Sequence, residues 1–217
     1  MSLRERLRLS TMVENGVVRV LQAGIAAMLF VGLVRIDPRL VVNAALALIG
    51  TVLPAILARD ARVHLGAGVT TMIAAALFFH TLGMVGVYEH IAWWDHLTHV
   101  FSAALVASLG YALTRAVDRH LEALYLPPRF TVAFVVLATL AVGVLWEVLE
   151  FLGRAVTVAL GTEPLLVQYG LEDTMLDLVF DVVGAVLIGV FGVGRLSRLT
   201  AALEAGLWSG TDGENRP

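Results

Sequence analysis

The sequence FTVAFVVLATLAVGVLWEVLEF, residues 130–151, decides the class of fold. It carries no ionisable side chain before Glu147. It is also long enough to cross the hydrocarbon layer of a bilayer, which takes about 20 helical residues. The run therefore predicts a membrane-spanning helix. Glu147 and Glu150 then lie at its end, and ionisable side chains inside a membrane persist mainly where they pair, face a wet cavity or do chemistry.

Five more apolar runs of similar length lie along the chain. Of the 217 residues, 59% are hydrophobic and 15% are charged, whereas soluble domains have roughly 45–50% apolar and about 25% charged residues. We predict an all-α, polytopic transmembrane bundle of about six spanning helices, forming one integral-membrane domain over residues 1–198. A disordered polar tail, residues 199–217, is expected to follow it. The expected spans are residues 16–34, 41–58, 66–88, 94–116, 130–151 and 174–194.

Composition excludes several classes of function. The chain has no cysteine, which rules out thiol nucleophiles, disulfides and thiolate metal sites. Its net charge is -3 and it has no basic stripe with interleaved aromatic residues, so we expect no nucleic-acid partner. The first apolar run has no small-residue cleavage site at its end, so we expect a retained span rather than a signal peptide. Neither a glycine-rich phosphate loop nor a G-x-S-x-G or H-E-x-x-H string is present.

Arginine positions predict how the spans are oriented, because cytoplasmic loops are enriched in basic residues. Twelve arginines fall on one side of the six spans, and three, Arg35, Arg39 and Arg154, fall on the other. This asymmetry predicts cytoplasmic N and C termini in the cell (inner) membrane. The acids and histidines of four spans then converge on the outer third of the bilayer. The twelve are Arg4, Arg6, Arg8, Arg19, Arg59, Arg62, Arg115, Arg119, Arg129, Arg195, Arg198 and Arg216.

The fourth span begins with two histidines and an aspartate. Asp95 and His99 are four residues apart, so they share one helix face and can ligate one ion. His96 flanks the same face. Alternatively, Asp95 caps the helix behind the interfacial tryptophans Trp93 and Trp94. That alternative does not explain why two histidines occur in the first turns of a membrane span.

The fifth span carries two carboxylates on one face, Glu147 and Glu150. Arg154 lies four residues beyond Glu150, so an ordinary Glu–Arg pair at a helix end is the alternative interpretation. That pair would leave Glu147 unmatched. If the helix continues to about residue 159, both glutamates lie near the middle of the membrane instead of near its outer surface.

The sixth span begins with an acidic stripe, in which Asp173, Asp177 and Asp181 follow one another at intervals of four residues. Asp173 alternatively caps the helix before Thr174. The third span contains a single histidine, His80, and such a residue is as often a hydrogen-bonded structural group as a ligand.

These side chains offer carboxylate oxygens and imidazole nitrogens, a set that suits Zn, Mn or Fe, while an oxygen-only subset would suit Ca or Mg. We therefore predict a divalent metal site, with Glu150 as a general base and Arg154 as the group that orients an anionic lipid or cell-envelope substrate. The expected metal ligands are Asp95, His99, Glu147, Asp173 and Asp177.

Three motifs along residues 88–189 resemble those of the YjdF-type uncharacterised bacterial inner-membrane proteins. They are D-x-x-x-H, E-x-x-E, and a Q-x-G followed by D-T-x-x-D and G-A. The resemblance implies a common site and supplies no reaction. The resemblance limits the core of the predicted site to the six ionisable residues of these motifs, and it makes His96 and Asp181 peripheral. The first two motifs are Asp95 to His99 and Glu147 to Glu150, and the third comprises Gln168, Gly170, Asp173, Thr174, Asp177, Gly184 and Ala185.

The chain is also distantly similar to VanZ-like membrane proteins, which pair an early D-x-x-x-H with a late acidic helix followed by glycines. Asp181 stands where those proteins usually carry asparagine.

Three functions are compatible with this pattern. The first is a metal-dependent hydrolase acting on a lipid or cell-envelope substrate, and the second is a non-catalytic ion-binding or envelope interaction protein. The third, a proton- or cation-coupled transporter, predicts polar groups that continue through the inner halves of spans three to six. The sequence shows no such groups, which makes the transporter the weakest of the three.

Overall fold

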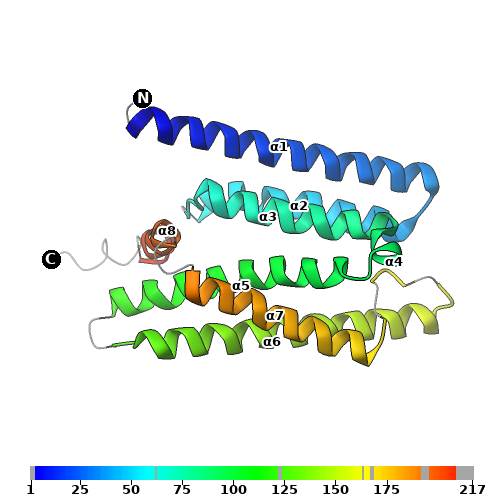
Figure 1. Ribbon diagram of the computed structural model, residues 1–217. Helices are drawn as coiled ribbons and strands as arrows, with labels where there is room; N and C mark the ends of the chain where they lie inside the picture. The colour runs from blue at the N-terminus through cyan, green and yellow to red at the C-terminus, as the bar shows by residue number, and fades with distance from the viewer. Residues whose placement is uncertain are drawn as a thin grey trace. The chain divides into compact units, whose positions relative to one another are not determined.

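The computed structural model describes residues 3–61, 63–121, 124–162, 164–166, 169–191 and 196–208. These residues form helices and connecting turns, with no strand among them, which confirms the all-α class (Figure 1). The elements are α1 (Leu3–Arg35), α2 (Pro38–Asp60), α3 (Ala67–Leu82), the π-helical turn η1 (Gly83–Val87), α4 (Tyr88–His90), α5 (Trp94–His120), α6 (Pro128–Ala159), α7 (Leu171–Phe191) and α8 (Ser197–Trp208).

Among the described residues, five helical segments are long and apolar enough to cross a membrane, and they coincide with the first five predicted spans. The sixth predicted span coincides with α7, whose first eleven residues include Glu172, Asp173, Asp177 and Asp181. This acidic helix is not among the five, so its passage through the bilayer stays a prediction. The five segments are Met12–Arg35, Pro38–Asp60, Ala67–His90, Trp94–His120 and Pro128–Ala159.

α6 is longer than the sequence analysis expected, since it ends at Ala159 rather than near residue 151. No proline or strained residue interrupts it before Gly161, which adopts a positive φ of 67°. There the N–H of Thr162 donates to the carbonyl of Thr157 at 2.9 Å, the 6→1 bond that closes many helix ends. Glu147 and Glu150 therefore lie well inside this helix. The alternative position near the middle of the membrane, which depended on a helix of this length, stays a prediction.

The predicted disordered tail is also partly helical, because α8 covers residues 199–208. Residues 209–217 lie outside the described part of the chain.

The chain divides into two compact units. The first unit comprises residues 1–52, 67–98 and 147–174, and the second comprises residues 53–66, 99–146 and 175–217.

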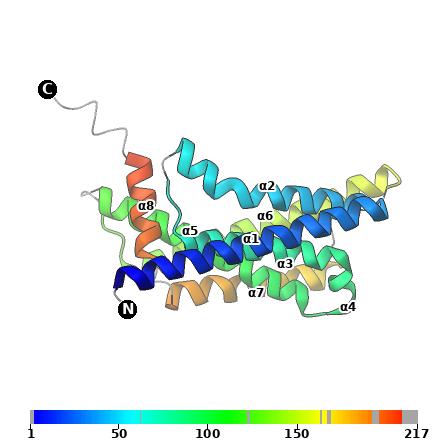
Figure 2. The same ribbon diagram turned by 90° about the horizontal axis from the view of Figure 1, so that it is seen from above.

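In the first unit, α1 lies along α3 (Figures 1 and 2). A glycine on α2 allows a similar approach, since a Cβ at Gly50 would lie 2.9 Å from Leu77 Cδ1 on α3. The core of this unit is built from Ile25, Met28, Leu40, Ala44, Ala47, Met84 and Tyr88.

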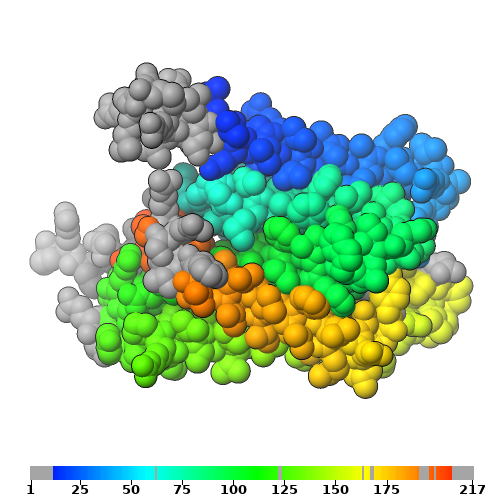
Figure 3. All heavy atoms as spheres, viewed as in Figure 1, coloured from blue at the N-terminus to red at the C-terminus, as the bar shows by residue number. Residues whose placement is uncertain are grey.

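In the second unit, α7 packs closely against α5 and α6 through its glycines. A Cβ added to Gly184 would lie 2.6 Å from the carbonyl oxygen of Val100 on α5, and one added to Gly189 would lie 3.3 Å from Val132 on α6. The opposite side of α7 lies on the surface (Figure 3), where Met175, Val179 and Val190 expose apolar side chains. Such a face suits contact with lipid.

Candidate metal centre

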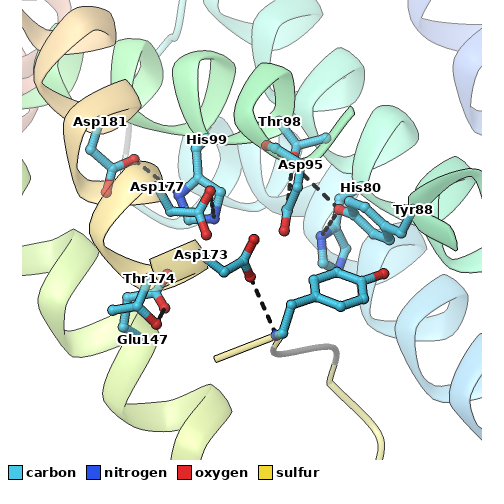
Figure 4. Close-up of polar contacts among 11 residues, drawn as sticks. His80, Tyr88, Asp95, Thr98, His99, Glu147, Asp173, Thr174, Asp177 and Asp181 are labelled. Atoms are coloured by element: carbon cyan, nitrogen blue, oxygen red, sulfur yellow. Dashed lines mark hydrogen bonds and ion pairs between the residues drawn. The ribbon is translucent and has the colours of Figure 1, made fainter. Parts of the chain in front are cut away.

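The centre of the candidate site lies in the second unit, where His99 of α5 faces two aspartates of α7 (Figure 4). His99 Nδ1 lies 3.2 Å from Asp181 Oδ1, and His99 Nε2 lies 3.9 Å from Asp177 Oδ1. The two aspartates are one helical turn apart and so share a face of α7. The exposed fractions of His99, Asp177 and Asp181 are only 8%, 2% and 4%.

A buried group of this kind needs helices that approach closely, and glycines provide that approach. Gly184 brings the backbone of α7 against α5 one turn beyond Asp181. Gly143 of α6 faces Asp181 directly, because a Cβ at this position would overlap Asp181 Oδ2. Both glycines therefore help to set the positions of the carboxylates around His99.

Asp95 precedes His99 by one turn on the same continuous helix, α5, and is half-buried. Asp95, His99 and Asp177 form a group that could hold a metal ion, since each offers one ligand atom and these atoms lie within 4.8 Å of one another. Three of the five predicted ligands therefore come together. In the described part of the chain, the other two, Glu147 and Asp173, are not members of this group.

Glu147 and Asp173 contact neighbours within the first unit. Glu147 is buried, and its Oε2 accepts a hydrogen bond of 2.7 Å from the hydroxyl of Thr174 at the start of α7 (Figure 4). Asp173 Oδ2 accepts a bond of 3.3 Å from the backbone N–H of Tyr169. Because Asp173 lies in the first turn of α7, it stabilises the helix start with its side chain, as an acid at this position often does. A ligand role for either residue stays a prediction.

The two predicted catalytic residues differ in burial, since Glu150 is buried and Arg154 is exposed. Their roles as base and substrate-orienting group stay predictions. Gln168 of the third motif lies outside the described residues.

His80 belongs to a hydrogen-bonded chain in the first unit. Its Nε2 lies 3.2 Å from Asn43 Oδ1, and its Nδ1 lies 3.1 Å from the hydroxyl of Tyr88. The Tyr88 hydroxyl lies 3.4 Å from Thr98 Oγ1. Thr98 in turn donates to the backbone carbonyl of Asp95 at 2.8 Å and lies 3.4 Å from Asp95 Oδ1. These contacts favour the structural interpretation of His80.

Asn43, Tyr88 and Thr98 were missed by the sequence analysis, which followed ionisable residues only. A buried amide or hydroxyl within an apolar helix also needs a partner, and that signal would have found Asn43 within the second span.

An acidic environment surrounds Tyr169, which precedes α7 and lies outside the five apolar helices. Partial burial raises the pKa of Tyr169 above its ordinary value, and the negative charges of Asp95, Glu89 and Asp173 raise it further. The beginning of α7 is therefore a region of negative potential within the first unit, which attracts cations.

Comparison with known proteins places these features in a family context. A family model described as "Predicted membrane protein (DUF2238)" matches residues 17–198. An uncharacterised protein of Thermotoga maritima is 30% identical over 115 residues, which cover 52% of this chain and 55% of the relative. The chain thus spans about half the length of the curated relative it matches. No solved structure matches.

The comparisons support part of the resemblance drawn from the motifs. The matched family is one of predicted membrane proteins, as the resemblance implied, although the YjdF-type name is not confirmed. The similarity to VanZ-like proteins has no support.

Proposed function

The chain belongs to the DUF2238 family of predicted membrane proteins, and we propose that this member binds a divalent metal ion at Asp95, His99 and Asp177. We further propose that it uses the ion to hydrolyse a lipid or cell-envelope substrate in the cell (inner) membrane. One observation carries the proposal: a ring nitrogen of His99 faces the carboxylate of Asp177 at 3.9 Å, while the other ring nitrogen contacts Asp181.

The protonation of His99 follows from its two neighbours. An ionised carboxylate only accepts hydrogen bonds, so the contact with Asp181 requires a hydrogen on Nδ1. In the neutral ring, Nε2 then carries a lone pair, which points toward the Asp177 carboxylate. Two electron-rich groups repel each other across this gap unless a cation lies between them.

The distance between these atoms also suits a metal ion. At 3.9 Å, Nε2 and Asp177 Oδ1 are too far apart for a hydrogen bond. Zinc bonds to nitrogen and oxygen of about 2.1 Å place two ligand atoms of a tetrahedral site roughly 3.4 Å apart. A small adjustment of side chains would therefore bring both atoms into bonding distance of one ion.

Three protein ligands also favour chemistry over a purely structural site. Structural zinc sites are closed by four protein ligands, whereas catalytic sites keep a position for water or substrate. One imidazole and two carboxylates suit Zn, Mn or Fe. A divalent ion held there would lower the pKa of a bound water toward about 7 and so supply a nucleophile at neutral pH.

Elemental analysis of the detergent-purified protein tests metal binding. We expect close to one equivalent of a divalent metal in the wild type and a loss of at least tenfold in His99→Ala and Asp177→Asn. Asp118→Asn is the matched control, because Asp118 also lies on a helix of the second unit but forms an ion pair with Arg115 instead. A wild-type protein of intact fold that binds no added metal would contradict the proposal.

The main alternative is a non-catalytic protein in which His99 carries hydrogens on both ring nitrogens and forms ion pairs with Asp177 and Asp181. The position of His99 between two carboxylates fits this alternative, because a positively charged ring would be attracted to both without a metal. Assays on vesicles containing phospholipids or lipid-linked envelope precursors separate the functions. Metal-dependent release of a product that is lost in Asp177→Asn supports the hydrolase, whereas metal binding without turnover supports static ion binding.

A further inference from the structure

We infer that Asp181 is a positioning residue that fixes the tautomer of His99 and aims Nε2 toward the Asp177 carboxylate, and that Gly143 holds Asp181 in place. The importance of this arrangement for metal binding rests on the proposed function. The assignment of the His99 tautomer does not, and it can be tested without a metal.

The two carboxylate oxygens of Asp181 have different surroundings. Oδ1 lies 3.2 Å from His99 Nδ1. Oδ2 is buried and has no hydrogen-bond partner among the described residues. A carboxylate oxygen removed from water in this way is costly unless the position of the whole group is useful.

The position of Oδ2 explains why a glycine occurs at residue 143. A Cβ there would overlap Oδ2 and would also lie 3.3 Å from Leu178 Cδ2. Only glycine lets the backbone of α6 come this close to the carboxylate, where its Cα–H group can make a weak contact with an oxygen. Asp181 therefore lies between the backbone of α6 and the ring of His99.

The consequence for His99 is a single tautomer and a single ring direction. A histidine that ligates a metal commonly donates its other N–H to a carboxylate, and loss of such a partner weakens metal affinity by about 10–100-fold. Asp181 occupies the position of that partner, one turn beyond Asp177. Its role thus differs from that of Asp177, although the two residues belong to one acidic stripe.

Nitrogen NMR of ring-labelled histidine in the metal-free protein tests the tautomer directly. The His99 signals are assigned by their loss in His99→Gln. We expect the hydrogen on Nδ1 in the wild type and in Asp181→Asn, whose side-chain carbonyl can still accept a hydrogen bond. Asp181→Ala removes the acceptor, so we expect a mixture of tautomers.

Gly143→Ala tests the second part of the inference, because its methyl group would displace the Asp181 carboxylate without altering any proposed ligand. Gly110→Ala is the matched control, since a Cβ at that half-buried helical position would lie 4.0 Å from Val135 Cγ2, its nearest neighbour. Thermal unfolding shows whether each variant is folded. We expect mixed tautomers in Gly143→Ala and the wild-type tautomer in Gly110→Ala.

Titration with Co²⁺, followed by its visible absorption, measures the effect on metal binding. We expect affinity to fall about 10–100-fold in Asp181→Ala and Gly143→Ala, less in Asp181→Asn, and not at all in Gly110→Ala. A hydrogen on Nε2 in the wild type, or on both ring nitrogens, would overturn the inference whatever the metal result. Wild-type protein with the Nδ1 tautomer but no Co²⁺ binding would refute the proposed function and leave the tautomer assignment intact.

Discussion

At the scale of single residues, one amide determines which ring nitrogen of the half-buried His80 carries the hydrogen. Asn43 Nδ2 donates to the carbonyls of Arg39 and Leu165, both at 2.9 Å, so its Oδ1 is the atom that faces His80. An oxygen acceptor at this position requires a hydrogen on His80 Nε2. In the neutral ring, Nδ1 then accepts the hydrogen bond that the Tyr88 hydroxyl donates. His80 is therefore held as one neutral tautomer.

This chain of hydrogen bonds predicts a loss of stability when it is cut. Tyr88→Phe removes the hydroxyl that donates to His80 Nδ1. This loss should lower the free energy of unfolding by about 1–3 kcal/mol. Tyr125→Phe is the control, because Tyr125 is largely exposed. Unfolding in mixed detergent micelles measures the difference. Equal stability of the two variants would contradict the assigned network.

The raised pKa of Tyr169 predicts a change in alkaline solution. Its hydroxyl keeps its proton in the folded protein at a pH where an unfolded chain, with a pKa of about 10, loses it. The protonated phenol therefore contributes stability below pH of about 10, and this contribution is lost as the pH rises through the higher folded-state pKa. Tyr169→Phe should remove a phase of the tyrosinate absorbance titration that lies above the ordinary tyrosine pKa, and it should reduce the alkaline loss of stability. The assignment would be wrong if the phase removed by Tyr169→Phe titrated at a lower pH than tyrosine does in a model peptide.

At the scale of helices, small residues decide how the acidic helix α7 packs. Gly184 and its neighbour Ala185 are buried, and Gly184 lies against the α5 backbone at a carbonyl oxygen that cannot move like a flexible side chain. The glycines that follow the acidic stripe therefore contribute to the candidate site although they carry no ligand atom. They bring α7 close enough for its aspartates to reach His99.

A methyl group at residue 184 should therefore disturb both stability and metal binding. Gly184→Ala places a Cβ 2.6 Å from the Val100 carbonyl oxygen, and overpacking of this kind typically costs about 1–3 kcal/mol. We expect a lower unfolding midpoint and weaker Co²⁺ binding than in Gly110→Ala, measured in the same detergent. Wild-type stability in Gly184→Ala would mean that α5 and α7 are not packed at this distance.

At the scale of the whole molecule, the absence of cysteine makes the predicted orientation easy to test. The arginine asymmetry predicts that the turn after α6 lies outside the cell and that the loop after α5 lies in the cytoplasm. Thr162 and Leu124 are exposed positions in these two segments. Each can therefore carry the single reactive thiol of the protein.

We expect a membrane-impermeant maleimide to label Thr162→Cys in intact cells and Leu124→Cys only after lysis. Labelling of Leu124→Cys in intact cells, with Thr162→Cys protected, would reverse the orientation. It would also move the predicted layer of acids and histidines to the cytoplasmic half of the membrane.

The sequence by itself determined the class of fold and much of the grouping within each helix. Long apolar runs allow few structures other than membrane helices, because a backbone in lipid must satisfy its own hydrogen bonds. Helical periodicity likewise put Asp95 beside His99, and Asp177 beside Asp181. It did not place the end of α6, since the sequence after Glu150 remains compatible with a helix as far as Gly161.

Only the tertiary structure decided which groups meet across helices. His99 contacts Asp181, 82 residues away, Glu147 contacts Thr174, and His80 contacts Asn43. The periodicity of one helix gives the face on which a residue lies but not its register against a neighbouring helix. Register depends on close packing, here at Gly143 and Gly184, and packing depends on pairs of residues far apart in the chain. Asp181, which the resemblance made peripheral, therefore lies against His99 in the structure.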